Sequence, residues 1–583
     1  MPGFYLTNME TCPEIKTDNM MLYRRVEFSN YKMFQHTTLK FPDDKCCELK
    51  EEYFSCIEGV ILNKKALFAE YGTNDISHLT FLMNQRNTEF FNDFRGSFSG
   101  MYWNRGADNW TVFTSHYGDG AVFYYQQEGK FIISSSMEWM AEGLKLNKVN
   151  YHVNEKAIYY MLTYGFMADD STYIQEVSRL LPGHYIKLKE TGFQIKPYYI
   201  LKNGKINLEN KSEAEIIEIL DELFIRAVKQ EYEKDLEYGY SHLVELSGGL
   251  DSRMNYWIAH ELGYGDSLAV TFCQSNYVDE LVAKQIAAYW KEEILVWPMD
   301  SAKHLYDVDK CTRLNFGVSL YSGAGSELHI FDSLDMQKYG ILHTGQLGGA
   351  ILGTYIKDEK EVYSLETAGN YSGKLLESYS DNSYSKYENR EEYLLNTRGL
   401  LGCLGSHLFA RHYTEECAPF LDVDVMDFCL SIPLSKRINR YIYKKWILSK
   451  HPEAAGFVWE RTGDMIDRSE FYLKWKQIKQ IAWDVITHPS LLLRKIGFPV
   501  KAPILSDYRG MNPMDKWLKD NKDLQMFVGE YYRTHIEIVG KFLSPKLMGD
   551  IEELYMQGSM GEKTQIFTAL SVIELLFANG NCK

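Results

Sequence analysis

A run of serine, glycine and aspartate between an expected strand and an expected helix constrains this chain more than any other feature. Leu243–Leu246 is a short apolar run typical of a buried strand, and apolar residues from Met254 to Leu262 follow at helical spacing. The six residues Ser247–Ser252, SGGLDS, join the two. The glycines let backbone amides approach a ligand, and the helix start adds free N–H groups with a partial positive charge. This pattern predicts a phosphate-binding loop.

Within this loop, each polar side chain could contact the phosphates of a nucleotide or their metal ion. The hydroxyls of Ser247 and Ser252 can donate to phosphate, whereas Asp251 repels phosphate and suits a Mg²⁺ ion that bridges phosphates. The spacing is not that of a Walker A loop. The alternative interpretation is a plain glycine turn in which Asp251 caps the helix.

The residues around the loop predict a parallel sheet. Leu268–Phe272, Ile294–Trp297 and Ile341–His343 are further strand candidates, and Leu281–Tyr289 fits a helix between two of them. Alternating strands and helices imply parallel strands with right-handed crossovers, and such sheets bind ligands at the carboxyl ends of their strands. From about Leu400 to Phe577 the pattern is mainly helical.

Residues 1–200 have a different pattern, with short strands separated by Gly, Asn and Asp turns. We expect stacked antiparallel sheets here. The predicted strands include Ser55–Leu62, Trp110–Ser115, Val122–Gln126, Phe131–Ser135 and His184–Lys189. Residues 201–211 form the expected linker, and a helix with a capping box of Ser212 and Glu215 starts the second domain, 212–583.

Composition excludes several classes of protein. The chain has 583 residues, a net charge of −16 and 45% hydrophobic residues, which describes a globular protein of more than one domain. An acidic chain is a poor general binder of nucleic acid or anionic membrane. We find no secretory signal and no apolar run of membrane-spanning length. The ten cysteines contain no CxxC pair, so we expect a cytoplasmic protein with free thiols and no zinc motif.

Several landmarks resemble the asparagine synthetase-like family. The SGGLDS loop is similar to the pyrophosphate loop of the ATP pyrophosphatase superfamily, in which ATP is cleaved between its α and β phosphates. The other landmarks follow in the order found in that family: Leu180–His184 resembles its LPPGH turn, Thr271-Phe272 followed by Asp279-Glu280 its second strand and helix start, Pro419–Asp422 its PFLD segment, and Lys445–Leu448 its catalytic-lysine segment.

This resemblance implies a fold class and a set of site residues. The fold would be α/β and multidomain, with an N-terminal-nucleophile-type αββα sandwich followed by a parallel-sheet ATP-pyrophosphatase domain with a helical C-terminal part. Lys445 and Gln346 would be catalytic, and Asp251 would hold the metal. ATP and pyrophosphate would contact Leu246, Ser247, Gly248, Gly249, Leu250, Asp251, Ser252, Thr271, Thr344 and Gly345.

The chain departs from the family in its glutaminase part. The nucleophilic cysteine of the family follows the initiator Met, whereas this sequence begins Met1-Pro2-Gly3, and proline has no nucleophilic side chain. The glutamine-binding NGEIYN segment is replaced by Glu58–Asn63, EGVILN. Cys12 would serve only after removal of eleven residues. We therefore expect an inactive glutaminase in which Gly3, Glu58 and Asn63 are structural.

The second departure lies in the synthetase part. The family's S-G-E-G-x-D-E loop corresponds to Thr344–Ala350, TGQLGGA. Gln346 replaces a catalytic glutamate, and an amide donates hydrogen bonds but takes no proton near neutral pH. Gly349 replaces an aspartate that holds Mg²⁺, so one metal ligand is missing.

The resemblance implies an ATP-dependent, amide-forming ligase with ATP and Mg²⁺ as cofactors. It would adenylate a small-molecule, peptide or glycan carboxylate and transfer it to ammonia or a substrate amine, releasing AMP and pyrophosphate without glutamine hydrolysis of its own. We expect no nucleic-acid or membrane partner, and a homodimer is the assembly left open. The alternatives are a catalytically impaired ATP-binding or scaffold member of the family and an RNA-acting pyrophosphatase-superfamily enzyme, against which the net acidity of the chain argues.

Overall fold

The structure is a computed structural model of the whole chain. It describes residues 2–15, 21–189, 192–356, 358, 369–376, 383–487 and 510–578. The description below refers to these residues.

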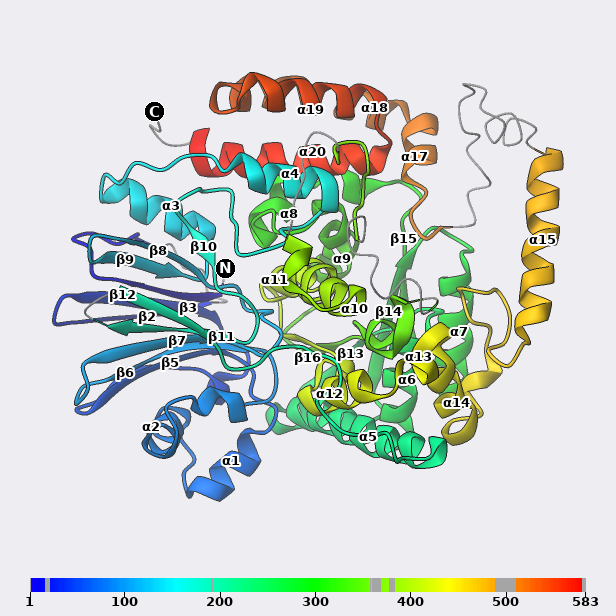
Figure 1. Ribbon diagram of the computed structural model, residues 1–583, viewed down its shortest axis with the longest axis horizontal. Coiled ribbons are helices and arrows are strands. Elements are labelled where there is room, and N and C mark those ends of the chain that lie inside the picture. Colours follow the sequence, from blue (N-terminus) through cyan, green and yellow to red (C-terminus); the bar gives the residue numbers. More distant parts are fainter. Residues whose placement is uncertain are drawn as a thin grey trace.

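The N-terminal part contains two antiparallel sheets of six strands each (Figure 1). Their facing surfaces bury apolar side chains such as Phe4, Phe54 and Ile133, which form one core cluster. The first sheet has the order β10-β8-β9-β1-β3-β2, with β1 Gly3–Thr7, β2 Met21–Phe28, β3 Tyr31–Thr38, β8 Phe123–Gln127, β9 Lys130–Ser134 and β10 Ser178–Arg179. The second has the order β12-β11-β7-β6-β5-β4, with β4 Cys46–Leu49, β5 Tyr53–Gly59, β6 Phe98–Asn104, β7 Asn109–Thr114, β11 His184–Lys189 and β12 Gly192–Pro197.

Helices cover both outer faces of this pair of sheets. Helix α2 (Ile76–Arg86) packs on β5, and α3 (Met137–Leu146) packs on β9. In Figure 1, α1 (Lys64–Tyr71) and α2 lie below the strands and α3 lies above them. The strands predicted in this part coincide with β5, β7, β8, β9 and β11, with ends that shift by up to three residues.

The second part contains a parallel sheet of five strands in the order β15-β14-β13-β16-β17. Its strands are β13 Ser241–Glu245, β14 Ser267–Cys273, β15 Glu293–Pro298, β16 Tyr339–His343 and β17 Glu416–Cys417. Helix α6 (Leu250–Glu261) follows β13 and α7 (Val278–Trp290) follows β14, as predicted. Because β13 is central, the loop after it lies at the carboxyl edge between two neighbouring strands.

The 26-residue helix α5 (Glu213–Tyr238) leads from the first part into the parallel sheet. Its N-terminus has the predicted capping box, in which Ser212 and Glu215 each bond the backbone N–H of the other. The helix packs on β16, α12 (Val423–Ser431) and α14 (Tyr441–Lys450). The expected linker lies between the end of β12 at Pro197 and the start of α5 and contains no helix or strand.

The helices near the C-terminus pack against the first part of the chain as well as the second. Helix α20 (Met560–Ile573) contacts α4 (Glu155–Tyr164) and α8 (Val308–Asn315). Gln565 donates to the carbonyl of Met161 on α4 at 2.8 Å. The two parts therefore share a continuous core.

Helix α15 (Glu470–Thr487) lies at the right edge of Figure 1. It carries a stripe of exposed apolar side chains, with Ile478 exposed by 66% and Ile486 by 71%. Among the described residues, no helix has the length and hydropathy needed to cross a lipid bilayer.

Candidate functional site

The loop Ser247–Ser252 connects β13 to α6 as the sequence predicts. The hydroxyls of Ser247 and Ser252 lie 2.9 Å apart, and the backbone N–H of Ser247 donates to Ser252 Oγ at 3.1 Å. Gly249 is the N-cap residue of α6, and its position supplies no side-chain cap. Asp251 is therefore not the cap of this helix. The first amides of α6 keep their donor capacity toward a ligand.

Gly248 is the tightest point of the loop. A Cβ at this position would lie 2.9 Å from Glu460 Cβ and 3.0 Å from Asp279 Oδ1, so only glycine fits. Its N–H donates to Asp279 Oδ1 at 2.7 Å. Asp279 lies in the first turn of α7 and fixes this loop.

Asp251 receives two hydrogen bonds from distant segments. The N–H of Gly349 donates to Oδ2 at 2.7 Å, and the hydroxyl of Tyr443 donates to Oδ1 at 2.9 Å. Burial raises the pKa of Asp251, whereas these two hydrogen bonds and the charge of Arg440 act in the opposite direction. A Cβ at Gly345 would lie 2.2 Å from the amide nitrogen of Ser252. The second loop, 344–349, therefore packs directly on the first.

Carboxyl groups lie near the loop, although the set of three side chains that is spaced to hold a metal ion among the described residues is Asp235, His242 and His343. Glu460 Oε2 is buried and has no hydrogen-bond partner among the described residues. Burial raises the pKa of Glu460, and the charges of Asp279 and Asp251 raise it further. Mg²⁺ prefers such hard oxygen ligands. Gly349 adds no carboxylate, as the sequence predicted.

Arg253 ties the following segment to the loop, and sequence reasoning did not identify this. It is fully buried, and its guanidinium donates to the carbonyls of Gly248 (2.9 Å), Ala454 (3.2 Å), Phe457 (3.1 Å) and Val458 (2.6 Å). Its place directly after the SGGLDS motif was the only available signal.

Lys445 does not reach this loop in the structure. It is exposed on α14, with Nζ 5.6 Å from the centre of the Tyr441 ring. Residues two apart in a helix point in nearly opposite directions, and it is Tyr443 that contacts Asp251. The cation whose charge acts on Asp251 is Arg440, which donates through Nε to Thr354 Oγ1 at 3.0 Å.

Gln346 lies at the carboxyl end of β16 in a fixed orientation. Its Nε2 donates to Glu416 Oε1 at 2.5 Å and to Ser406 Oγ at 2.8 Å. Its Oε1 lies 3.2 Å from His407 Nε2. The other ring nitrogen of His407 lies 3.6 Å from Asp119, a residue of the N-terminal part. A buried polar connection therefore joins the two parts of the chain at Gln346.

Three other predicted nucleotide contacts are support residues of the loop. Leu246, Thr271 and Thr344 are almost completely buried. The N–H of Leu246 donates to the carbonyl of Val270 at 2.9 Å, and the carbonyl of Thr344 accepts from Asn255 at 2.8 Å.

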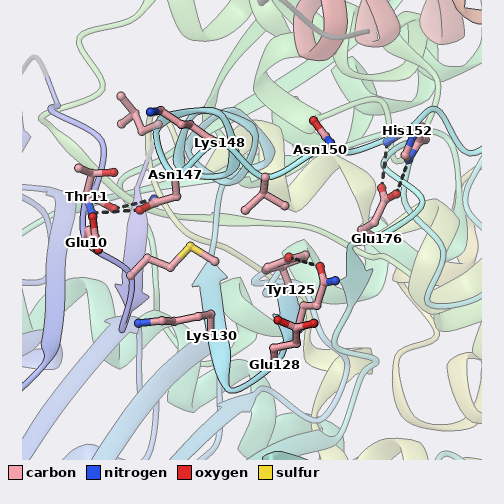
Figure 2. A pocket seen from close by; sticks show the side chains of 14 residues that line it. Glu10, Thr11, Tyr125, Glu128, Lys130, Asn147, Lys148, Asn150, His152 and Glu176 are labelled. Atoms are coloured by element: carbon pink, nitrogen blue, oxygen red, sulfur yellow. Dashed lines mark hydrogen bonds and ion pairs between the residues drawn. The ribbon is translucent and has the colours of Figure 1, made fainter.

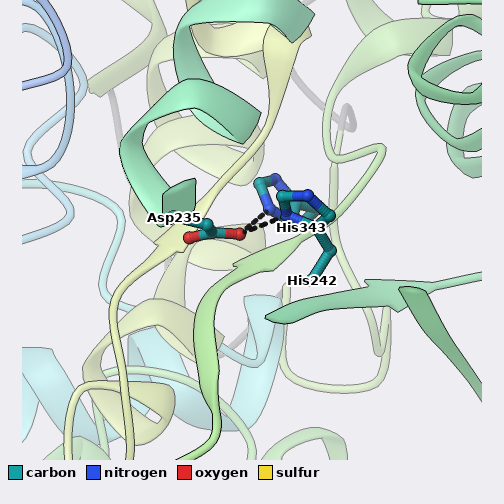
Figure 3. Close-up of side chains that lie close together, drawn as sticks. All are labelled: Asp235, His242 and His343. Atoms are coloured by element: carbon teal, nitrogen blue, oxygen red, sulfur yellow. Dashed lines mark hydrogen bonds and ion pairs between the residues drawn. The ribbon is translucent and has the colours of Figure 1, made fainter. Parts of the chain in front are cut away.

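His343, at the end of β16, belongs to a buried charge cluster (Figure 3). Asp235 Oδ2 lies 2.8 Å from His242 Nδ1 and 2.7 Å from His343 Nε2, and Glu231 lies 3.3 Å from His343 Nδ1. Burial alone would lower the pKa of His343, but Asp235 and Glu231 raise it to about 9. The three side chains could also hold a metal ion by their spacing. Hydrogen bonds account for their geometry, and they support β13 and β16.

The N-terminal part places the expected glutaminase residues in structural roles. Glu58 is buried and accepts from Thr37 Oγ1 at 2.6 Å and Gln35 Nε2 at 3.0 Å. A Cβ at Gly3 would lie 2.4 Å from Ser135 Cβ, and Cys12 follows the opposite end of β1.

A wide groove lies elsewhere on this part of the molecule (Figure 2). It has a volume of about 900 Å³, is lined by residues such as Lys130, Asn147 and Glu176, and contains none of the predicted site residues.

Comparison with known families matches residues 51–199 to the family described as "Glutamine amidotransferase domain". This segment is about a quarter of the chain and includes β5 to β12. No curated protein sequence matches the chain.

Three solved structures show weak likenesses. One is glutamine phosphoribosylpyrophosphate amidotransferase from B. subtilis complexed with ADP and GMP, with 9% identity over 40% of this chain and 50% of that chain and a TM-score of 0.20. Another is NMN synthetase from Francisella tularensis, with 17% identity over 24% and 59% and a TM-score of 0.18. A third is the allosteric regulatory enzyme of purine biosynthesis, with 7% identity over 46% and 66% and a TM-score of 0.21.

The chain spans less than two thirds of each of these structures, and likenesses of this size carry no argument about its fold or function. Residues 51–199 of the N-terminal part are therefore similar to glutamine amidotransferase domains.

Proposed function

We propose that this protein is an ATP-dependent, amide-forming ligase of the asparagine synthetase-like type. It adenylates a substrate carboxylate and transfers the acyl group to a nitrogen nucleophile, without glutamine hydrolysis of its own. The observation that carries this proposal is the loop Ser247–Ser252, where an uncapped helix N-terminus adjoins three carboxyl groups, Asp251, Asp279 and Glu460, and the guanidinium of Arg440.

The reaction takes two steps. A carboxylate oxygen attacks the α-phosphorus of ATP, the bond from this phosphorus to the bridging oxygen breaks, and pyrophosphate leaves. The nitrogen then attacks the acyl carbon, AMP leaves with the electron pair of its bond, and the nitrogen gives up a proton. Loop amides and a cationic side chain stabilise the negative charge that develops on the phosphates.

Mg²⁺ would be held by Asp251 with help from the unpartnered oxygen of Glu460, and it would neutralise phosphate charge. The family resemblance would assign phosphate binding to Lys445. The position of Arg440 near Asp251 favours Arg440 as the cation that binds phosphate. Gln346, catalytic by the family resemblance, would donate a hydrogen bond to the acyl intermediate by giving up its bond to Ser406, because both N–H groups of its amide are used by Glu416 and Ser406 and its oxygen faces His407.

The N-terminal part would be a degenerate glutaminase with an N-terminal-nucleophile-type sandwich. The family match and the two stacked sheets with helices outside support this assignment. Glu58 occupies the expected glutamine-binding segment and lies 3.5 Å from Lys45, so a buried ion pair replaces a ligand-binding amide there. The substrate would be a small-molecule, peptide or glycan carboxylate, and the protein would be cytoplasmic.

An exchange of labelled pyrophosphate into ATP, screened over carboxylates, tests this proposal. We expect exchange with at least one carboxylate and its loss in Asp251→Ala, with Asp266→Ala on the exposed turn before β14 as the matched control. ATP binding without exchange for any carboxylate would contradict the ligase proposal. It would support the scaffold alternative, which the two protein hydrogen bonds to Asp251 and the missing carboxylate at Gly349 favour.

A further inference from the structure

Gln346 lines a second cavity. It has a volume of about 390 Å³, within the range that holds small organic ligands. Its walls come from the end of α4, from α9 (Tyr321–Ser333), from the π-helix Leu395–Cys403 and from α11 (Gly405–Ala410). The side chains of Phe166 and Leu320 give it apolar surface, and Glu327 and Gln346 give it polar surface.

The polar end of this cavity is acidic. Glu327 of α9 lines the cavity, and its Oε2 is buried without a hydrogen-bond partner among the described residues. Glu416, at the end of the sheet beside Gln346, is only 2% exposed, and its Oε2 also lacks a partner there. Glu245 ends β13, two residues before the nucleotide loop. Glu327 of α9 and Glu416 of β17 thus place two carboxyl groups from separate elements beside Gln346.

These carboxyl groups are close enough to affect one another. Burial raises the pKa of Glu327, and the charge of Glu245 raises it further. Burial likewise raises the pKa of Glu416, followed by the charges of Glu327 and Glu245. Burial raises the pKa of Glu245 to about 7. Unpaired buried carboxylates are costly, and a cation between them would remove the cost.

The cavity wall itself offers little compensating positive charge. Among its described lining residues, Arg398 carries the single cationic side chain, and Arg398 is exposed. An anionic ligand would therefore meet Glu327 without a buried counter-charge. A ligand with a cationic nitrogen and an apolar body fits both ends of the cavity.

We propose that this cavity binds the nitrogen nucleophile as a primary amine with an apolar body, held as an ammonium ion by Glu327 with Glu245 and Glu416 behind it. The carboxylate of Glu327 takes one proton from the ammonium group, and the neutral amine then attacks the acyl carbon with its lone pair. This inference rests on the proposed function and decides between the nucleophiles left open there, because ammonia needs neither the volume nor the apolar walls. Gln346 lines the cavity, and its own loop packs on Ser252, so the amine would lie next to the acyl group.

Calorimetric titration of the full-length protein with benzylamine tests the proposal directly. Benzyl alcohol and benzoate are neutral and anionic probes of the same size. We expect benzylamine to bind at least tenfold more tightly than either, and Glu327→Gln to weaken benzylamine at least tenfold. Glu293→Gln, on an exposed position of β15, is the matched control and should leave the affinity unchanged. Equal binding of the three probes, or unchanged affinity in Glu327→Gln, would overturn the proposal.

A second readout locates the amine. Cys403 lines the cavity and is exposed to it. Benzylamine should slow maleimide labelling of Cys403, detected by peptide mass analysis, and should not slow labelling of Cys12. Equal slowing at both cysteines, or none at Cys403, would place the amine elsewhere.

Pyrophosphate exchange needs no amine, so the two proposals fail separately. Exchange in the wild type that persists in Glu327→Gln while amide formation falls at least tenfold supports the amine site. Loss of all exchange with benzylamine still bound through Glu327 would reject the ligase and keep the cation site. Exchange and amide formation that are both unchanged in Glu327→Gln would reject the amine site alone.

Discussion

At the scale of single residues, the nucleotide loop depends on partners that are distant in the sequence. Asp251 contacts Gly349 and Tyr443, and Arg253 contacts the segment after residue 453. The sequence motif predicts the loop because strand, glycines and helix are adjacent. It does not predict these partners, because they reach the loop only through the packing of α14 and of the loop after β16.

At this scale we predict that Arg440, and not Lys445, binds the phosphates of ATP. We expect Arg440→Ala to weaken ATP binding about tenfold, because charge-assisted hydrogen bonds contribute about 1.5–3 kcal/mol. Lys445→Ala should change the affinity less than twofold, since its side chain is exposed on the other side of α14. Calorimetric titration with ATP and Mg²⁺ measures both. A large loss of ATP affinity in Lys445→Ala alone would contradict this prediction and support Lys445 as the phosphate-binding residue, as the family resemblance implies.

The buried cluster around His343 predicts a pH dependence of stability. The folded pKa of about 9 exceeds the value near 6.5 of an unfolded histidine. The stabilisation is therefore complete below pH ~6.5 and is lost as the pH rises through about 9. It amounts to about 3 kcal/mol in the wild type. Thermal unfolding between pH 6 and pH 10 should show this loss in the wild type and a flatter profile in His343→Gln. Parallel stability profiles for the wild type and His343→Gln would contradict this pH dependence.

At the scale of elements, the sequence predicted most helices and strands whose signals are local. The capping box of α5, the apolar run of β13 and the helical spacing of α6 depend on neighbouring residues, and each element formed where it was expected. The face that a helix turns to the site depends on tertiary packing. On α14, Trp446 is buried against Asp221 of α5, and this contact turns Tyr443 toward Asp251 and Lys445 toward solvent.

The cap of α5 provides a test at this scale. Ser212→Ala removes the hydroxyl that accepts from the backbone N–H of Glu215 at 3.2 Å. We expect a loss of about 1 kcal/mol, measured as a lower midpoint of thermal unfolding. Ser212→Thr keeps the hydroxyl and should recover most of that loss. Equal midpoints for the alanine and threonine variants would show that the cap contributes nothing.

At the scale of the whole molecule, a buried ion cluster joins the two parts of the chain. Arg411 follows α11 and is 4% exposed, and its guanidinium lies 3.6 Å from Asp119 and 3.4 Å from Glu415. It also donates to Ser97 Oγ at 2.8 Å. These residues are up to 318 positions apart, which is why sequence patterns gave no sign of the cluster.

Removing Arg411 should weaken the contact between the two parts of the chain, so that they unfold less cooperatively. Arg411→Ala removes the cation between Asp119 and Glu415. Lys45, 3.7 Å from Glu415, and the hydroxyl of Ser115, 2.5 Å from Asp119, still compensate part of the charge, so we expect a cost near the lower end of the range of about 3–5 kcal/mol. We expect faster limited proteolysis within residues 201–210 and a lower first transition in calorimetric unfolding. Arg411→Lys should recover part of the loss. Unchanged proteolysis and unfolding in Arg411→Ala would show that the cluster does not hold the parts together.

Hydrogen–deuterium exchange with and without ATP and Mg²⁺ tests the central claim most directly, because it needs no knowledge of the carboxylate. We predict that the nucleotide slows exchange most strongly in peptides covering residues 246–254, where the amides of the loop and the first turn of α6 would bind phosphate. Protection confined to other segments, with residues 246–254 unchanged under saturating ATP, would contradict the account.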